Sequence, residues 1–241
     1  MKIIEKLNAR QNSLKNPPVT IAFIGDSITQ GCFEVYFKND GNLETVYDYQ
    51  SSFATRLREL LSLLYPSVQV NIINCGISGD NAQNGFARLG SDVLTHSPDL
   101  VVIGYGANDC VRDGKGGESE YAEDLRKIFR AVKASGAEAI YVTEGPLCTG
   151  TSPHISDPRI VEIAEKFAPI ENSGLMQSYF EAGKATAEAE GVKVCDLYSV
   201  WKTLELGGVD ITELLANKLN HPNRKFHHYM AIKLLETMFE T

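Results

Sequence analysis

The chain has 241 residues, of which 43% are hydrophobic and 22% are charged, a balance that is ordinary for a globular protein with one full core. Its net charge of −8 argues against a surface for nucleic acid or for anionic lipid headgroups, since both kinds of surface are normally basic. No run approaches the about 18 apolar residues of a membrane span, and the start of the chain lacks the apolar centre of a signal peptide. The five cysteines show no paired short spacing, so free thiols in a reducing compartment are expected. We therefore expect one domain over residues 1–241, located in the cytoplasm, with no nucleic-acid partner and no membrane insertion.

Strand-like apolar runs alternate with helical stretches along the chain, which is the βαβ pattern of a parallel sheet. The runs predict strands at residues 19–24, 68–74, 99–104, 138–144 and 192–196. Apolar residues at helical spacing predict helices at 51–65, 80–96 and 118–135, one helix or a broken pair within 157–190, and a last helix after residue 221. Asp80 is the expected N-cap of the second helix, and Pro222 is the expected first residue of the last one. We predict an α/β fold, a three-layer α/β/α sandwich with about five parallel strands of the flavodoxin-like kind.

Two connections are longer than a parallel sheet needs. Residues 32–50 carry several aromatic side chains among acidic groups, and residues 145–158 carry three prolines and His154. We expect both segments to be loops beside the carboxyl ends of the strands, where long loops commonly form binding walls or lids.

Three of the predicted strands end in small polar residues. The segments concerned are Gly-Asp-Ser-Ile-Thr-Gln-Gly at 25–31, Asn-Cys-Gly-Ile-Ser-Gly-Asp at 74–80, and Gly-Tyr-Gly-Ala-Asn-Asp at 104–109. Because the carboxyl ends of parallel strands form the site crevice of an open α/β sheet, we expect the three segments to lie together. With a late histidine, His221, they suggest a serine hydrolase assembled from four distant segments.

Ser27 directly follows a strand, where its hydroxyl could act as a nucleophile and its backbone N–H as an oxyanion donor. An isolated serine at such a position is more often only a helix N-cap. Thr29 occupies the second glycine position of the Gly-x-Ser-x-Gly elbow, which excludes the ordinary α/β-hydrolase arrangement. No Gly-x-Gly-x-x-Gly follows a strand, which excludes the usual dinucleotide site.

The four segments together strongly resemble the SGNH (GDSL-type) hydrolase family, which is named for its Ser, Gly, Asn and His blocks. The resemblance covers roughly residues 19–235, and the order and spacing of the blocks agree. Ile28 stands where the name-giving motif has leucine, and residues 76–90 look most like the lysophospholipase/thioesterase branch. The matching blocks are Gly25-Asp26-Ser27 with Thr29 and Gly31, the segment 74–80, the segment 104–109, and His221-Pro222-Asn223.

The resemblance implies a set of catalytic residues. Ser27 would be the nucleophile, and His221 would be the general base that takes its proton and later returns it to the leaving group. The oxyanion hole would consist of the N–H groups of Ser27 and Gly79 and the side-chain amide of Asn108. This chemistry needs no cofactor, and the histidines and cysteines show no metal-ligand spacing.

Two further residues are candidates for substrate contact. Asp26 precedes the expected nucleophile, and His154 lies in a segment expected beside the crevice. A cysteine nucleophile, Cys32 or Cys148, is a weaker alternative, because both look like ordinary free thiols.

The chain departs from the family pattern at one position. The family usually places an aspartate three residues before the histidine, and here that position is Lys218. Loss of such an acid can cost about 10⁴ in rate in related serine chemistry. Three outcomes are open: a backbone carbonyl near 218–220 accepts the Nδ1 hydrogen, Asp210 or Glu213 folds back to the histidine, or the site is weak or inactive. A lysine beside the base would also tend to lower the imidazole pKa.

The sequence therefore favours a serine esterase or lipase-type acylhydrolase that cleaves a small-molecule carboxylic ester through an acyl-enzyme. One alternative is a carbohydrate O-acetyl esterase or acyltransferase of the same family, because the aromatic and acidic segment 32–50 would suit a sugar as well as an acyl chain. The other is a binding module with a decayed catalytic site, which Lys218 motivates. The sequence leaves the acyl length, the alcohol and the oligomeric state open.

Overall fold

The computed structural model describes residues 1–240, and its centre over that range is a five-stranded parallel sheet with the order β4-β1-β5-β6-β7. The strands are β1 (Val19–Gly25), β4 (Val70–Gly76), β5 (Leu100–Gly104), β6 (Glu138–Val142) and β7 (Lys193–Cys195). All five predicted strands are confirmed, and β4 lies slightly further along the chain than predicted.

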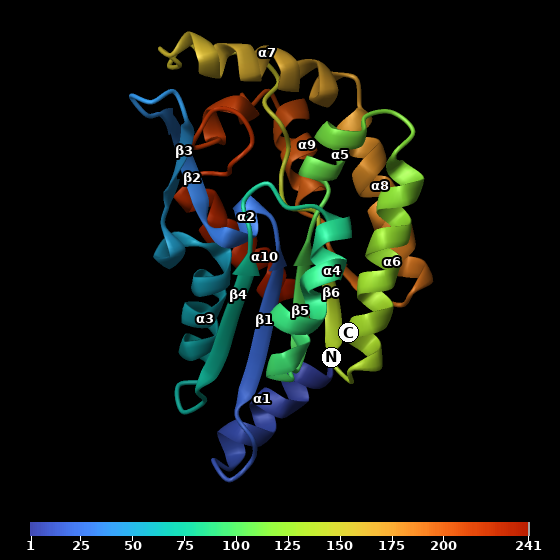
Figure 1. The fold of residues 1–241 in the computed structure, drawn as a ribbon. Coiled ribbons are helices and arrows are strands. Elements are labelled where there is room, and N and C mark those ends of the chain that lie inside the picture. The colour runs from blue at the N-terminus through green and yellow to red at the C-terminus, as the bar shows by residue number, and fades with distance from the viewer. Residues whose placement is uncertain (241) are drawn as a thin grey trace.

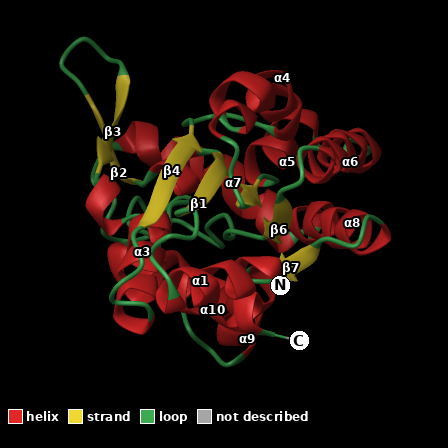
Figure 2. Cartoon of the chain, turned by 90° about the horizontal axis from the view of Figure 1, so that it is seen from below, coloured by secondary structure: helices red, strands yellow, loops and turns green. Residues whose placement is uncertain are grey.

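Helices cover both faces of this sheet (Figures 1 and 2). In β1, Ile21 and Phe23 point into one core and Ala22 and Ile24 into the other, as the period of two in a strand requires. This confirms the three-layer sandwich, because each core is closed by its own helices. The first is covered by α1 (Lys2–Asn12), α3 (Phe53–Leu64), α9 (Tyr198–Leu206) and α10 (Arg224–Phe239), and the second by α4 (Ala82–Asp92), α6 (Glu118–Ala134) and α8 (Leu175–Ala189).

The remaining elements gather mostly around the carboxyl ends of the strands. Figure 1 shows the strand arrows pointing toward the same end of the molecule, with α7 crossing beyond it. The elements are α2 (Ser27–Gln30), β2 (Cys32–Phe37), β3 (Leu43–Tyr47), α5 (Ala107–Asp113) and α7 (Pro158–Asn172), with short 3₁₀ turns at Tyr49–Ser51, Leu94–His96 and Ile211–Leu214.

The segment 32–50 was expected to be a loop, but it is mainly an antiparallel hairpin of β2 and β3. The consecutive residues Val35, Tyr36 and Phe37 in β2 are of the β-branched and aromatic types that strands favour. Residues 145–157 are irregular, as expected. The segment 157–190 is a broken pair, α7 and α8, because Gly174 adopts a left-handed conformation between them.

Two expected helix starts are wrong by one or two residues. The N-cap of α4 is Asn81, whose side chain accepts from the N–H of Asn84, while the carboxylate of Asp80 is used elsewhere. The last helix begins at Arg224, because Asn223 caps it and Pro222 forms a β-bridge with Leu215 instead. Within residues 1–240, none of the helices has the length and apolar character that crossing a membrane requires.

Candidate functional site

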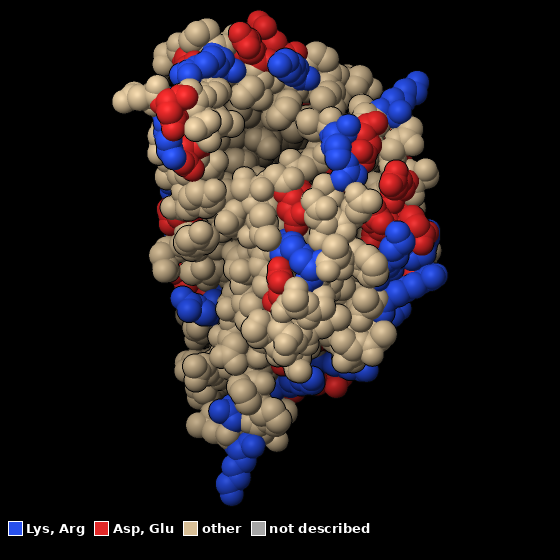
Figure 3. Space-filling view, in the orientation of Figure 1, with Lys and Arg blue, Asp and Glu red and all other residues tan. Residues whose placement is uncertain are grey.

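The carboxyl ends of the three expected site strands lie side by side. Gly25 pairs with Gly76 on one side and with Gly104 on the other, and each is the last residue of its strand. The N–H of Ile77 also donates to the carbonyl of Gly25 at 3.0 Å. The three polar segments therefore leave the sheet at one level. Figure 3 shows the molecular surface hollowed at this end, beneath α7, with uncharged side chains in the visible hollow and charged ones around it.

The hydroxyl of Ser27 and the imidazole of His221 are in direct contact. Ser27 Oγ lies 2.9 Å from His221 Nε2, and His221 Nδ1 lies 2.9 Å from the carbonyl oxygen of Phe33. A carbonyl oxygen can only accept, so Nδ1 carries the hydrogen and Nε2 is left to accept the serine proton. This is the tautomer that a general base for Ser27 requires.

The atom that orients the imidazole differs from those expected. It is a backbone carbonyl, but that of Phe33 rather than one near residues 218–220. No carboxylate within residues 1–240 is hydrogen-bonded to His221. Asp210 instead accepts from the N–H of Thr212, and Glu213 forms an ion pair with Lys218 at 2.9 Å.

Burial lowers the pKa of His221 to about 4, so the ring is neutral at neutral pH. The ring is 5% exposed, and the hydrogen bond to Phe33 offsets only part of the lost hydration. The pKa of His221 is lowered as expected, but Lys218 is not the cause, because its ammonium group pairs with Glu213.

Gly79 and Asn108 border the same end of the sheet. Gly79 has a φ of +79°, a left-handed conformation that favours glycine, and the space where its side chain would stand is empty. Its N–H donates to no protein acceptor within residues 1–240. The Nδ2 of Asn108, on α5, donates to the carbonyl of Asp80 at 2.9 Å and to Oδ2 of Asp26 at 3.2 Å.

Asp26 directly precedes Ser27 and is buried, so it does not lie in the open crevice. Its carboxyl group is 1% exposed and accepts from the N–H of Ile28 at 2.8 Å. Its neighbour Glu144, just after β6, accepts from the hydroxyl of Thr29. Burial raises the pKa of Asp26 to about 7 and that of Glu144 well above its usual value, so the two carboxyls keep a proton between them at neutral pH. Direct substrate contact by Asp26 does not fit this position.

Gly104 makes room for this pair of carboxyls. A Cβ at Gly104 would lie 2.4 Å from Cδ of Glu144, a distance that real side chains essentially never show. The absence of a side chain at the end of β5 is therefore what lets Glu144 approach the end of the sheet.

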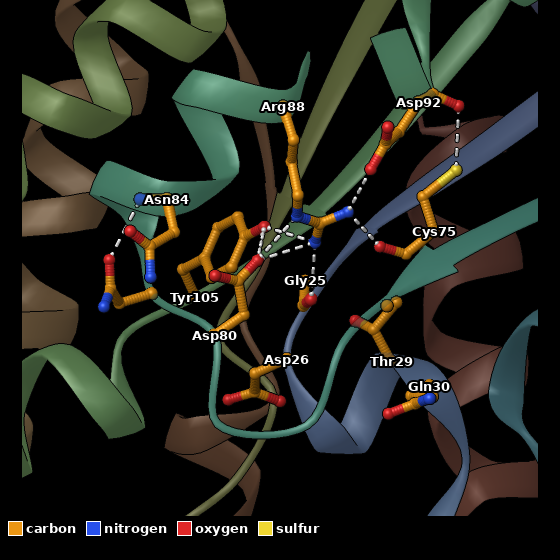
Figure 4. A network of polar contacts seen from close by, with 12 residues as sticks. Gly25, Asp26, Thr29, Gln30, Cys75, Asp80, Asn84, Arg88, Asp92 and Tyr105 are labelled. Carbon is orange, nitrogen blue, oxygen red and sulfur yellow. Dashed lines mark hydrogen bonds and ion pairs between the residues drawn. The ribbon is translucent and has the colours of Figure 1, made fainter.

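Arg88, on α4, joins the three strand ends (Figure 4). Its guanidinium forms an ion pair with Asp80 at 2.7 Å and donates to the carbonyls of Cys75 at 2.6 Å and Gly25 at 3.2 Å. It also donates to the hydroxyl of Tyr105 at 3.0 Å, which in turn donates to Asp80. The Arg88 side chain thus binds both Asp80, which follows Gly79, and Gly25, which ends β1 shortly before Ser27.

The other expected candidates lie outside this group. His154 is largely exposed, and its imidazole lies 3.9 Å from a carboxylate oxygen of Glu213. Cys32 and Cys148 are fully buried, and burial raises the pKa of their thiols to about 12 and about 11, so neither is a thiolate nucleophile. No cluster of potential metal ligands is found in the described part of the chain.

Sequence reasoning missed Phe33, Glu144 and Arg88. An acidic residue within two positions of the end of a buried strand was a usable signal for Glu144, since Asp26 also follows a buried strand. Arg88 gave no signal, because a lone arginine on a helix is usually a surface residue. Phe33 could not be found, because it acts through a carbonyl that every residue has.

Comparison with known proteins shows the family of the chain. The sequence model of the GDSL-like lipase/acylhydrolase family matches residues 23–229. Thioesterase 1/protease 1/lysophospholipase L1 of Escherichia coli (strain K12) is 30% identical over 121 residues, which are 50% of this chain and 49% of that protein. An acetylxylan esterase of Geobacillus stearothermophilus is 33% identical over 92 residues, 38% of this chain and 40% of that protein. The chain thus spans about half or less of the length of these relatives.

Solved structures share the fold. A two-domain esterase active on acetylated mannans is similar with a TM-score of 0.70 at 20% identity, over 99% of this chain and 54% of that one. A likeness at this identity speaks for the fold alone. The family match, by contrast, covers most of the chain and includes both Ser27 and His221. The chain belongs to the GDSL-like lipase/acylhydrolase family.

Proposed function

We propose that this protein is a carboxylic ester hydrolase that works through an acyl-enzyme on Ser27. The observation that carries the proposal is the His221 ring, which contacts Ser27 Oγ with Nε2 and the Phe33 carbonyl with Nδ1, each at 2.9 Å. Membership of an acylhydrolase family supports it, as do relatives named as a thioesterase/lysophospholipase and as an acetylxylan esterase.

In the first half of the reaction, Ser27 Oγ attacks the ester carbonyl carbon while its proton passes to His221 Nε2. The C=O electrons move onto the oxygen and give a tetrahedral oxyanion. When this collapses, the bond to the alcohol oxygen breaks, and the departing oxygen takes the proton from Nε2. In the second half, a water molecule repeats the attack on the acyl-enzyme, with His221 again taking and returning the proton.

The oxyanion is stabilised by the N–H groups of Ser27 and Gly79 and by Nδ2 of Asn108. Asn108 exchanges its longer hydrogen bond, 3.2 Å to Asp26, for the oxyanion and keeps the 2.9 Å bond to the carbonyl of Asp80. The proton that Asp26 shares with Glu144 leaves this pair with one negative charge instead of two behind the developing oxyanion. Loss of one donor of this kind costs about 10²–10³ in kcat.

A carbohydrate O-acetyl ester is the second candidate substrate. It is favoured by the similarity to the acetylxylan esterase, whereas a longer acyl ester is favoured by the similarity to the lysophospholipase. Comparing kcat/KM for the acetyl and octanoyl esters of 4-nitrophenol, and acetate release from an acetylated xylo-oligosaccharide, separates the two.

Fluorophosphonate labelling followed by mass spectrometry tests the proposal without a guess about the substrate. We expect one adduct, on Ser27, and hydrolysis of 4-nitrophenyl acetate that Ser27→Ala abolishes. Ser62→Ala, an exposed serine on α3, is the matched control and keeps full activity. Failure of the folded wild type to label or to hydrolyse the ester would reject the proposal and favour a binding module with a decayed site.

A further inference from the structure

The Phe33 carbonyl is set toward His221 by an irregularity in the β2–β3 hairpin. Cys32 pairs with Tyr47 and Val35 with Thr45, so β2 has one extra residue between these pairs. Phe33 lies within this bulge and is therefore outside the regular ladder, which leaves its carbonyl oxygen to accept from His221 Nδ1. Bulges commonly re-aim groups beside functional sites in this way.

Arg224 contacts the residues of this bulge. Its guanidinium binds both carboxylate oxygens of Glu34, at 2.5 and 3.0 Å, and its Nε donates to Asp48 at 2.8 Å. The same guanidinium lies 4.3 Å from the centre of the Phe33 ring. A bidentate pair and a stacked ring fix direction as well as distance, which a lysine ammonium cannot do.

The three partners of Arg224 come from β2 and from the residue that follows β3. Glu34 follows Phe33 directly, and Asp48 comes just after β3. Phe33 is fully buried, and its ring also packs against the ring of His227, with the ring centres 4.7 Å apart. The residue that supplies the carbonyl is thus contacted by two side chains of α10, the helix that begins three residues after His221.

The charges of this group also favour the reaction. The guanidinium of Arg224 lowers the pKa of both Glu34 and Asp48, so both are ionised at neutral pH. One cation between two anions leaves a net negative charge near the imidazole. The hydrogen bond to the Phe33 carbonyl favours the protonated form of His221, and the charge of Glu34 adds a smaller effect in the same direction.

We propose that Arg224 is a positioning residue, which with Glu34 and Asp48 holds the Phe33 carbonyl against His221 Nδ1 in place of the acid expected at position 218. The inference rests on the proposed function, because the imidazole must work as a base for its orientation to matter. The three residues are called the Arg224 clamp below.

The test compares Arg224→Met with Arg159→Met. Arg159 is the matched control, because it also stacks on an aromatic ring of the hairpin, Phe37 at 3.9 Å, and also pairs with an acid, Asp157. We expect Arg224→Met to lower kcat about 10–100-fold with KM changed less than about threefold, since the acceptor is loosened and not removed. Arg159→Met keeps the wild-type kcat.

Two more conservative variants are expected to give intermediate losses of kcat, and they keep the test informative if Arg224→Met fails to fold. Glu34→Gln keeps the size of the side chain and removes its charge, and we expect kcat to fall about 3–10-fold. Arg224→Lys keeps the charge without the bidentate geometry, and its kcat is expected between those of the wild type and Arg224→Met. Equal kcat for wild type, Arg224→Met and Glu34→Gln, with native circular dichroism, would overturn the proposal.

Nitrogen-15 NMR of the histidine rings gives a readout that mere destabilisation does not move. The wild-type His221 signal, assigned by its loss in His221→Asn, is expected as the Nδ1–H tautomer alone, and Arg224→Met is expected to mix it with the Nε2–H form. An unchanged tautomer in a variant with lowered kcat would reject the clamp. This measurement needs no substrate, so it separates failure of the clamp from failure of the proposed ester hydrolysis, which Ser27→Ala reports.

Discussion

The acid limb of the pH–rate profile tests the chemistry of His221 most directly. A general base works only when it is unprotonated, so kcat/KM of the free enzyme falls as the pH drops through the pKa of that base. An unperturbed histidine titrates near about 6.5. Burial lowers the pKa of His221 to about 4, because the residue is only 5% exposed, and the hydrogen bond from Nδ1 to the Phe33 carbonyl offsets only part of this effect.

The expected size of the effect follows from this shift. The change amounts to about 3 kcal/mol in favour of the neutral ring, at about 1.4 kcal/mol per pKa unit. We therefore expect kcat/KM at pH 5.5 to stay within about twofold of its value at pH 7. A base with a pKa of about 6.5 would keep only about a tenth of its activity over the same interval.

The assay is hydrolysis of 4-nitrophenyl acetate, read at a wavelength where nitrophenol and nitrophenolate absorb equally, with Ser27→Ala as the blank. Circular dichroism must show native protein at each pH, because His227 is also buried and its pKa is lowered to about 3. Both histidines bind protons more readily in the unfolded chain, so stability falls as the pH drops below about 6.5. An acid limb centred near 6.5 in folded protein would refute the reasoning, since it would mean that a carboxylate or bulk water reaches the ring.

Three substitutions extend the tests to the surroundings of the dyad. Arg88→Met removes the cation that pairs with Asp80, and we expect kcat to fall about 10²-fold with little change in KM. The control Asp92→Asn loses only the outer contact of Arg88 and is expected to keep most of its activity. Equal losses of kcat in the two variants would contradict this prediction. Glu144→Gln mimics an acid that is protonated in the folded state and ionised in the unfolded chain above its ordinary pKa of 4.5, so wild-type stability declines as the pH rises. In urea unfolding the variant should therefore gain stability relative to wild type on going from pH 4 to pH 7, and parallel pH dependences would count against a buried proton. Lys218→Asp should leave kcat/KM within about threefold, because the lysine side chain ends beside another acid and not beside the imidazole; a tenfold gain would show that a carboxylate there reaches the ring.

The sequence was sufficient for the sheet and for the meeting of Ser27 with His221. The sheet and the gathering of three polar segments follow from apolar runs whose carboxyl ends share one edge, whereas the pairing of Ser27 with His221 is what the resemblance to the SGNH family implies. The register that aligns Gly25 with Gly76 and Gly104 makes this geometric argument hold in three dimensions.

The surroundings of the dyad could not be predicted in the same way. The surroundings of Asp26 depend on Glu144, which approaches only because Gly104 has no side chain. The anchor of His221 is a main-chain atom whose direction depends on a bulge in the hairpin, and the residue type at position 33 does not encode it. Both features arise from tertiary packing between segments that are far apart in the chain.

Ser27 and His221 are 194 residues apart along the chain, and this separation has a consequence for the synthesis and folding of the protein. During synthesis β1 and the serine leave the ribosome long before α10 does, so the hydroxyl has no base to activate it while most of the chain is being made. Closing so long a loop is among the contacts with the greatest entropic cost in this fold. If Ser27 and His221 work together as proposed, acyl transfer begins only when the segment that carries His221 and α10 has docked. The onset of esterase activity in a refolding experiment would then report completion of the whole fold rather than formation of its sheet.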